Sequence, residues 1–113
     1  MDRKFPEPDW KVFRDLKHVA LNRFCERVLG EIVAIAGNSR KSHHERYLAL
    51  YKRLHNRDKE LANAFDGMAR SRAFDQLVLI RHQKLLTDDE FARFSAETRE
   101  RVDGYLAIMT GGR

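Results

Sequence analysis

The chain has 113 residues and a formal net charge of +5, and 42% of its residues are hydrophobic while 35% are charged. This length suits one domain with one core, and the apolar fraction excludes a chain that is disordered throughout. No run of 18 apolar residues and no apolar leader segment is present, and the single cysteine, Cys25, cannot form an internal disulfide.

The first predicted element is a long amphipathic helix. Apolar residues recur at steps of three and four from Phe13 onward, which indicates one apolar stripe along about 28 residues. Asp9 is expected to cap the start of this helix, because its carboxylate can accept a free amide of the first turn. Gly37 and Asn38 predict its end. Gly30 lies within the stripe, where a close helix crossing is expected.

A capping box predicts the start of the second helix. From Ser42 to Glu45, the serine hydroxyl and the glutamate carboxylate can each accept an otherwise unpaired amide. Asp58 falls on the apolar side of this helix. A buried carboxylate needs a partner, so Arg81 or another base of the third helix is expected to pair with it. The residues expected on the buried face are Tyr47, Leu50, Tyr51, Leu54, Leu61 and Phe65.

Three shorter helices are expected after the second. One spans roughly 70–85, and the apolar run that ends at Ile80 places it at the centre of the core. A strand is the competing interpretation of that run, and we reject it because helical sequence lies on both sides. Gly67 is either a break or an interior glycine. Thr87 and Ser95 then supply caps for two further helices.

These elements predict an all-α fold. The chain is expected to form a single domain over residues 1–113, built as a mostly antiparallel bundle of four to five helices. Residues 1–8 and 110–113 are expected to be flexible. The lone cysteine and the lack of a leader segment indicate a cytoplasmic location.

The patterns of known catalytic and metal-binding sites are missing. His44 and Glu45 begin a zinc-protease pattern, but Leu48 stands where the second histidine is required. There is no Cys-x-x-Cys pair, no glycine-rich phosphate loop and no nucleophile elbow. Cys25 is expected to be a small buried residue, since His18 lies two helical turns away and cannot act as its base. No catalytic residue, metal ligand or cofactor is therefore expected, and an enzyme of unrecognised type is the third interpretation.

The net positive charge is concentrated in the middle of the chain. Residues 38–72 contain nine basic and four acidic side chains, whereas the segments before and after carry net charges of +1 and −1. Such a segment can neutralise nucleic-acid phosphates, but we favour a solvated face of an amphipathic helix. The candidate contacts for nucleic acid or for an acidic partner are Arg40, Lys41, Lys52, Arg53, Arg57 and Lys59.

Phe5 and Trp10 form a second candidate surface near the start of the chain. If they are exposed beside Phe13, they make an apolar patch for a partner. If they fold back, they hold the first helix against the bundle. We favour folding back, and we keep both residues as candidate interface residues.

Helix caps and apolar spacing combine in three runs, which are Asp9-Trp10-Lys11-Val12-Phe13-Arg14, His44-Glu45-Arg46-Tyr47 and Leu86-Thr87-Asp88-Asp89-Glu90-Phe91 followed by Phe94-Ser95. On these runs the chain resembles small all-helical bacterial proteins of uncharacterised families. The resemblance covers most of the chain. It implies a compact helical fold and a bacterial cytoplasm, and it brings no activity and no catalytic residue.

Two functions from different classes follow. The first is a non-enzymatic helical interaction or regulatory module that associates with itself, as a dimer, or with another protein. It rests on the missing catalytic patterns and on eleven Phe, Tyr and Trp residues in a small domain. The alternative is a nucleic-acid-binding accessory protein that uses residues 38–72. No membrane contact is expected.

Overall fold

The structure, a computed structural model, describes residues 5–67 and 69–111. These residues form a single domain of five α-helices and one short 3-10 turn, with no strand among them, which confirms the predicted all-α fold. In chain order the elements are α1 (Glu7–Ala36), α2 (His43–Phe65), η1 (Arg70–Arg72), α3 (Ala73–His82), α4 (Asp88–Phe91) and α5 (Ala96–Met109).

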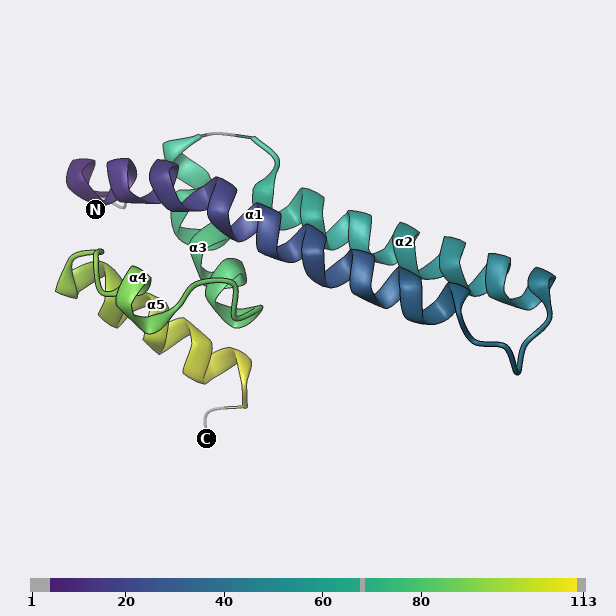
Figure 1. Ribbon diagram of the computed structural model, residues 1–113. Helices are drawn as coiled ribbons and strands as arrows, with labels where there is room; N and C mark the ends of the chain where they lie inside the picture. Colours follow the sequence, from purple (N-terminus) through teal and green to yellow (C-terminus); the bar gives the residue numbers. More distant parts are fainter. Residues whose placement is uncertain (1–4, 68, 112–113) are drawn as a thin grey trace.

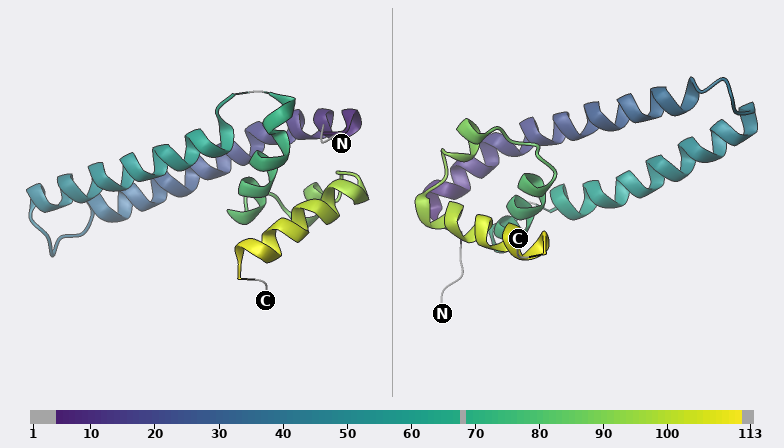
Figure 2. Two further views of the ribbon diagram at one scale, coloured as in Figure 1. Left: turned by 180° about the vertical axis from the view of Figure 1, so that it is seen from behind. Right: turned by 90° about the horizontal axis from the view of Figure 1, so that it is seen from below.

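The molecule is a long helical hairpin with a cluster of shorter helices at one end (Figure 1). α1 and α2 run antiparallel, while α3, α4 and α5 gather at the end that holds the first half of α1 (Figure 2). The overall extents of 55 × 31 × 26 Å reflect the part of the hairpin that projects beyond this cluster. We call the projecting residues 29–60 the arm and the remainder the base.

Three predicted helix starts are confirmed by their hydrogen bonds. Ser42 Oγ accepts from the Glu45 amide at 3.0 Å, and the Glu45 carboxylate accepts from the Ser42 amide at 2.8 Å. Thr87 and Glu90 form the same reciprocal pair at the start of α4. Ser95 Oγ accepts an amide three residues further on and caps α5. Each of these helices therefore begins where its local sequence satisfies the free amides of the first turn.

The role predicted for Asp9 is wrong. α1 begins at Glu7 with Pro6 as its N-cap, because proline is compatible with the first helical turn, so Asp9 lies inside the helix. Its carboxylate is buried and accepts from the Ser95 amide at 2.8 Å and the Ser95 hydroxyl at 2.7 Å. It also accepts from the Thr98 hydroxyl at 2.6 Å. A carboxylate of α1 therefore anchors Ser95, the N-cap residue of α5, across the fold.

The core lies in the base. Leu77 and Ile80 are at most 1% exposed, which confirms the predicted central position of α3. Phe13 of α1 is also 1% exposed, and its ring meets that of Phe5 edge-on. The Phe5 ring contacts Phe94 in turn, with 6.2 Å between the ring centroids. This aromatic cluster joins the residues before α1 to the connection between α4 and α5.

The third predicted helix is shorter than expected. Gly67 breaks the chain after α2 with a φ of +76°, a left-handed conformation that glycine adopts without steric cost. Residues 70–72 form the 3-10 turn, and α3 begins only at Ala73. Beyond the end of α3, Lys84 has a φ of +59°, which turns the chain away from the helix axis. The segment 70–85 thus consists of a 3-10 turn, a short helix and a change of chain direction at Lys84.

Two further expectations concern Gly30 and the ends of the chain. The close crossing predicted at Gly30 is wrong, because a Cβ placed there meets no atom of another described element within 4 Å. Of the segments expected to be flexible, residues 1–4 and 112–113 lie outside the described residues. Phe5 is buried and α1 follows almost at once, so residue 5 and those after it belong to the fold.

A salt bridge ties the short helix α4 to α1. Arg23 donates to the two carboxylate oxygens of Glu90 at 2.6 and 2.9 Å, and to the Leu85 carbonyl at 2.9 Å. Glu90 also accepts from the Thr87 amide. These hydrogen bonds to the charged carboxylate, first of all that from Arg23, lower the pKa of Glu90 to about 2. The pair therefore holds the segment after α3 against α1.

This pairing predicts a loss of stability in acid. Because the pKa of Glu90 is lowered to about 2, its contribution to the free energy of unfolding is complete above the ordinary pKa of 4.5 and disappears as the pH falls toward 2. Glu90→Gln is expected to lower this free energy by about 1–2 kcal/mol at pH 7 and by much less at pH 2. Urea unfolding at the two pH values measures the difference. Glu97→Gln, at an exposed position, is the control, and an equal loss at both pH values would contradict the prediction.

Candidate functional site

The arm contains no buried residue. Across the described residues 29–60, every residue is at least partly exposed to solvent. Even the most buried apolar positions, such as Ile32 and Leu50, are only half-buried. Helices in water depend on the packing of an apolar face, so a hairpin without a further layer has little stability of its own. The arm therefore lacks the covering layer that the base possesses.

One side of the arm is apolar. Leu29 and Val33 of α1 are 64% and 70% exposed. On α2, Tyr47, Tyr51 and Leu54 are 67%, 62% and 49% exposed. Spacings of three and four residues put each set on one side of its helix. We call these five residues the apolar face. The other exposed large apolar side chains are Leu48 on α2 and Tyr105, Ile108 and Met109 on α5.

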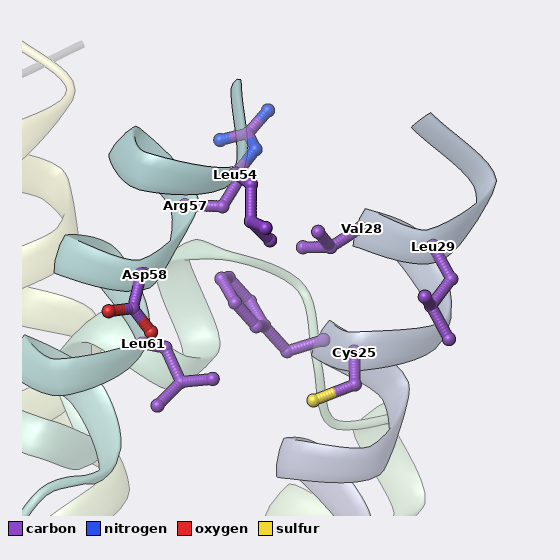
Figure 3. A pocket seen from close by; sticks show the side chains of 8 residues that line it. Cys25, Val28, Leu29, Leu54, Arg57, Asp58 and Leu61 are labelled. Atoms are coloured by element: carbon purple, nitrogen blue, oxygen red, sulfur yellow. The ribbon is translucent and has the colours of Figure 1, made fainter. Parts of the chain in front are cut away.

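A hollow of about 200 Å³ lies between the two helices on this side (Figure 3). Leu29 of α1 and Leu54 of α2 both line it, so the two exposed sets lie on the same side of the hairpin. Figure 3 shows the side chains of Val28 and Leu54 pointing toward each other across it. The hollow is smaller than the roughly 300–1,000 Å³ of small-molecule sites, and it suits one side chain of a partner better than a cofactor. The other lining residues are Phe24, Cys25, Arg57, Asp58 and Leu61.

An ion-pair network joins α1 and α2 at the edge of the hollow, where Arg57 is one of the lining residues. Glu31 accepts from Arg57 Nε at 2.9 Å and Nη2 at 3.1 Å, and it also pairs with Arg53 at 3.3 Å. Arg57 pairs in turn with Glu60, which accepts from Gln83 of the base at 3.0 Å. The hydrogen bond from Arg57 is the main cause that lowers the pKa of Glu31. The two helices are thus held in register beside the hollow, while the side that carries the apolar face stays open.

The structure does not bring the six basic candidates together. Arg53 and Arg57 both pair with Glu31 of α1, and Arg57 also pairs with Glu60, so two carboxylates largely neutralise their charge within the arm. The other four are spread over the length of the arm. They are Arg40 and Lys41 in the exposed turn between α1 and α2, and Lys52 and Lys59 on the exposed surface of α2.

Phe5 and Trp10 fold back onto the base, as favoured from the sequence. Phe5 is 1% exposed, and its carbonyl accepts from Arg70 Nε at 2.9 Å. Trp10 is half-buried and stacks on Phe13, with 6.1 Å between the ring centroids. The guanidinium of Arg14 lies over the Trp10 ring. Phe5 is therefore a core residue, and Trp10 offers a partner only part of its ring.

Cys25 and Asp58 lie in surroundings that differ from those predicted. Cys25 is half-buried in the wall of the hollow rather than enclosed in the core. Asp58 lines the same hollow and is exposed. Arg81 pairs instead with Asp88 and lies over the Phe91 ring. The predicted pairing of Asp58 with Arg81 is wrong because Asp58 lies on the open side of the arm.

The buried face predicted for α2 is largely wrong. Phe65 is 5% exposed and packs on Phe24, but Tyr47, Tyr51 and Leu54 are about half exposed or more. The buried end of α2 is the end that meets the base, because α3 covers the hairpin only there. The sequence did hold one signal for an open face. α1 carries Leu29 and Val33 outside its main apolar stripe, beyond what contact with one neighbouring helix requires.

Neither metal chemistry nor known relatives assign a function to this surface. In the described part of the chain, no three His, Cys, Asp or Glu side chains lie close enough to hold one metal ion together. Of the helices formed by residues 5–67 and 69–111, none combines the length and the apolar character required to cross a membrane. Comparisons with protein-family models, curated proteins and solved structures find no match to this chain.

Proposed function

We propose that this protein is a non-enzymatic helical interaction module that binds a protein partner through the apolar face of its arm. One observation carries the proposal: the described residues 29–60 include no buried residue, yet they expose five large apolar side chains on one side. Contiguous exposed apolar surface of this kind marks interaction sites. In this proposal the base supplies a packed support, and the arm presents the binding surface.

Docking would supply the packing that the arm lacks. At roughly 100 Å² of exposed surface each, the five side chains offer about 500 Å² to a partner. Burial of that area is worth on the order of 10 kcal/mol before the costs of association are subtracted. Two of the five are tyrosines, a residue type that is enriched at interfaces because an apolar ring carries a polar hydroxyl.

The ionisable groups support a structural role. The pKa values of Glu31 and Glu90 are lowered by hydrogen bonds from arginines that tie elements together. The pKa of Glu45 is lowered by the Ser42 amide in a helix cap. None of these three carboxylates lines the hollow. Burial lowers the pKa of Lys17, whose ammonium donates to a backbone carbonyl near the end of α2, in the base.

Nucleic-acid binding through residues 38–72 has less support. A phosphate-binding stripe requires uncommitted positive charge along one face. Arg53 and Arg57 are paired with Glu31, and the basic residues of the turn at the tip lie at the far end of α2 from Lys59. Binding to duplex DNA or RNA that falls steeply with salt would favour this alternative.

Site-specific photocrosslinking tests the proposed function. A benzophenone amino acid replaces Tyr51 on the apolar face in one variant and the exposed Ala49 in the other, and the full chain is made in the cells that produce it. The two positions are about 200° apart around the helix axis. Irradiation is expected to give a covalent adduct with a protein from position 51 and none from position 49. The absence of adducts from both positions, or equal adducts from both, would overturn the proposal.

A further inference from the structure

We infer that the partner on the apolar face is a second copy of this chain, docked antiparallel across a two-fold axis that passes close to Leu54. This inference rests on the proposed function, because it names the occupant of the same surface. Four observations carry it. They are the position of the tyrosines relative to the hollow, the chemistry of the hollow, the distribution of charge along the arm, and the area of the face.

The apolar face fits against the same face of a second copy that runs in the opposite direction. Toward the tip, Tyr51 and Tyr47 lie three and seven residues from Leu54, which is about 4 and 10 Å along α2. Toward the base, Asp58 and Leu61 of the hollow lie four and seven residues from Leu54, which is about 6 and 10 Å. A two-fold axis at Leu54 therefore sets the tyrosines of each copy over the hollow of the other, as an isologous interface requires.

The tyrosine side chains of one copy also match the chemistry of the hollow in the other. The hollow is lined by apolar side chains of both helices, which include Leu29 of α1, and Asp58 lines it from α2 (Figure 3). A buried tyrosine ring needs apolar contacts, and its hydroxyl needs a hydrogen-bond partner, which a carboxylate can provide. Asp58 is exposed and makes no ion pair with any described residue. Docking of a tyrosine from the second copy gives this carboxylate a donor.

The distribution of charge selects the antiparallel orientation. Glu26 and Asp58 lie three and four residues from Leu29 and Leu54, so they are exposed near the base on the side of the apolar face. The exposed Arg27 and Lys59 follow them by one residue and lie about 100° further around their helices. Arg40 and Lys41 occupy the turn at the tip. In an antiparallel pair, Glu26 and Asp58 of each copy lie toward Arg40 and Lys41 of the other. In a parallel pair, like charges would face each other at both ends, which is unfavourable.

The area of the face is sufficient for a dimer. The five side chains of each copy together bury about 1,000 Å² in the pair, before the hollow and the neighbouring surface are counted. This total exceeds the roughly 800 Å² below which most incidental contacts fall. Two hairpins stacked in this way form a four-helix arrangement with the apolar side chains inside, a common way for helices to bury one apolar side.

Disulfide trapping tests the arrangement, because the chain has one cysteine, Cys25, and it lines the hollow. Tyr47→Cys and Tyr51→Cys each introduce a thiol that docking brings to Cys25 of the other copy. Within one chain, position 47 lies about 16 Å and position 51 about 10 Å along α2 from Asp58, which lines the same hollow as Cys25. A disulfide needs Cα atoms within roughly 7 Å, so neither variant is expected to form one within a single chain. Mild oxidation is expected to give a covalent dimer whose peptides join position 25 to position 47 or 51.

The control for trapping is Ala49→Cys, a variant at an exposed position away from the apolar face. It is expected to remain monomeric under the same oxidation. A dimer joined from position 47 to position 47 would indicate a parallel pair and overturn the orientation. The absence of a covalent dimer from both tyrosine variants, or equal dimer from Ala49→Cys, would overturn the second copy as the partner.

Sedimentation equilibrium of the native chain measures the association directly. The chain is expected to form a dimer with a dissociation constant of about 1–100 μM. Leu54→Lys is expected to raise this constant at least ~100-fold, because two ammonium groups would meet near the axis. Ala49→Lys is expected to change it less than ~3-fold. Circular dichroism verifies that both variants are folded, and a native chain that is monomeric at millimolar concentration would overturn the inference.

The two proposals fail in different ways. If the native chain is monomeric but position 51 still gives photo-adducts with a different protein, the second copy is overturned and the proposed function stands. If the native chain is monomeric and position 51 gives no adduct, both are overturned. If position 51 gives adducts between copies of this chain, both are supported.

Discussion

Asp9→Ala is expected to lower the free energy of unfolding by about 3 kcal/mol. The carboxylate of Asp9 is 2% exposed and accepts three hydrogen bonds from Ser95 and Thr98. Alanine leaves the Ser95 amide and the buried Thr98 hydroxyl without this acceptor, and each unsatisfied buried group costs about 1–3 kcal/mol. The substitution also removes the anchor between the first turn of α1 and the start of α5. Urea unfolding followed by circular dichroism measures the loss.

The matched control for Asp9 is Asp15, which lies on the same helix. Asp15 is 70% exposed and pairs with Arg93 at 3.4 Å, so Asp15→Ala is expected to cost less than about 0.5 kcal/mol. Asp9→Asn keeps one acceptor oxygen, but its amide nitrogen is a donor that faces the donors of Ser95 and Thr98. The loss of free energy of unfolding is therefore expected to lie between those of Asp9→Ala and Asp15→Ala. Equal losses for the alanine variants at positions 9 and 15 would show that the contact across the fold does not stabilise the protein.

Phe13→Ala is expected to lower the free energy of unfolding by about 3–5 kcal/mol, a large fraction of the stability of a domain of this size. Phe13 is 1% exposed and lies between the rings of Phe5 and Trp10. Removal of its ring leaves a cavity in the cluster that joins the start of the chain to the α4–α5 connection. Thermal and urea unfolding both measure the loss.

Leu29→Ala is the matched control for Phe13, since it truncates a large apolar residue of the same helix that is 64% exposed. At low protein concentration, where the chain is monomeric, it is expected to cost less than about 0.5 kcal/mol. At high concentration the cost is expected to grow, because association stabilises the folded state by mass action. A loss at low concentration as large as that of Phe13→Ala would show that the arm is covered within a single chain.

The features predicted correctly from the sequence are those that neighbouring residues determine. The capping boxes at Ser42 and Thr87 close within four residues, so the amides that they satisfy can be identified from spacing alone. The apolar run that ends at Ile80 covers more than one side of a helix, and only a central position buries all of it.

The features that were missed depend on which segments meet in space. Periodicity placed Tyr47, Tyr51 and Leu54 on one side of α2, but it does not tell whether another layer covers that side. The acceptor role of Asp9 depends on Ser95, a residue 86 positions further along the chain. A carboxylate beside the prolines of a first turn has the local pattern of a cap for its own helix, and nothing nearby in the sequence distinguishes the two roles.

The bridge from Asp9 to Thr98 also sets the order in which the protein can be completed during synthesis. Ribosomes release a chain from its N-terminal end, so α1 and α2 can pair as soon as Phe65 has emerged. At that moment Phe5 still lacks Phe94, and Asp9 still lacks all of its hydrogen-bond donors. The base closes only when α5 arrives, and until then a growing chain exposes its unfinished core together with the apolar face of the arm.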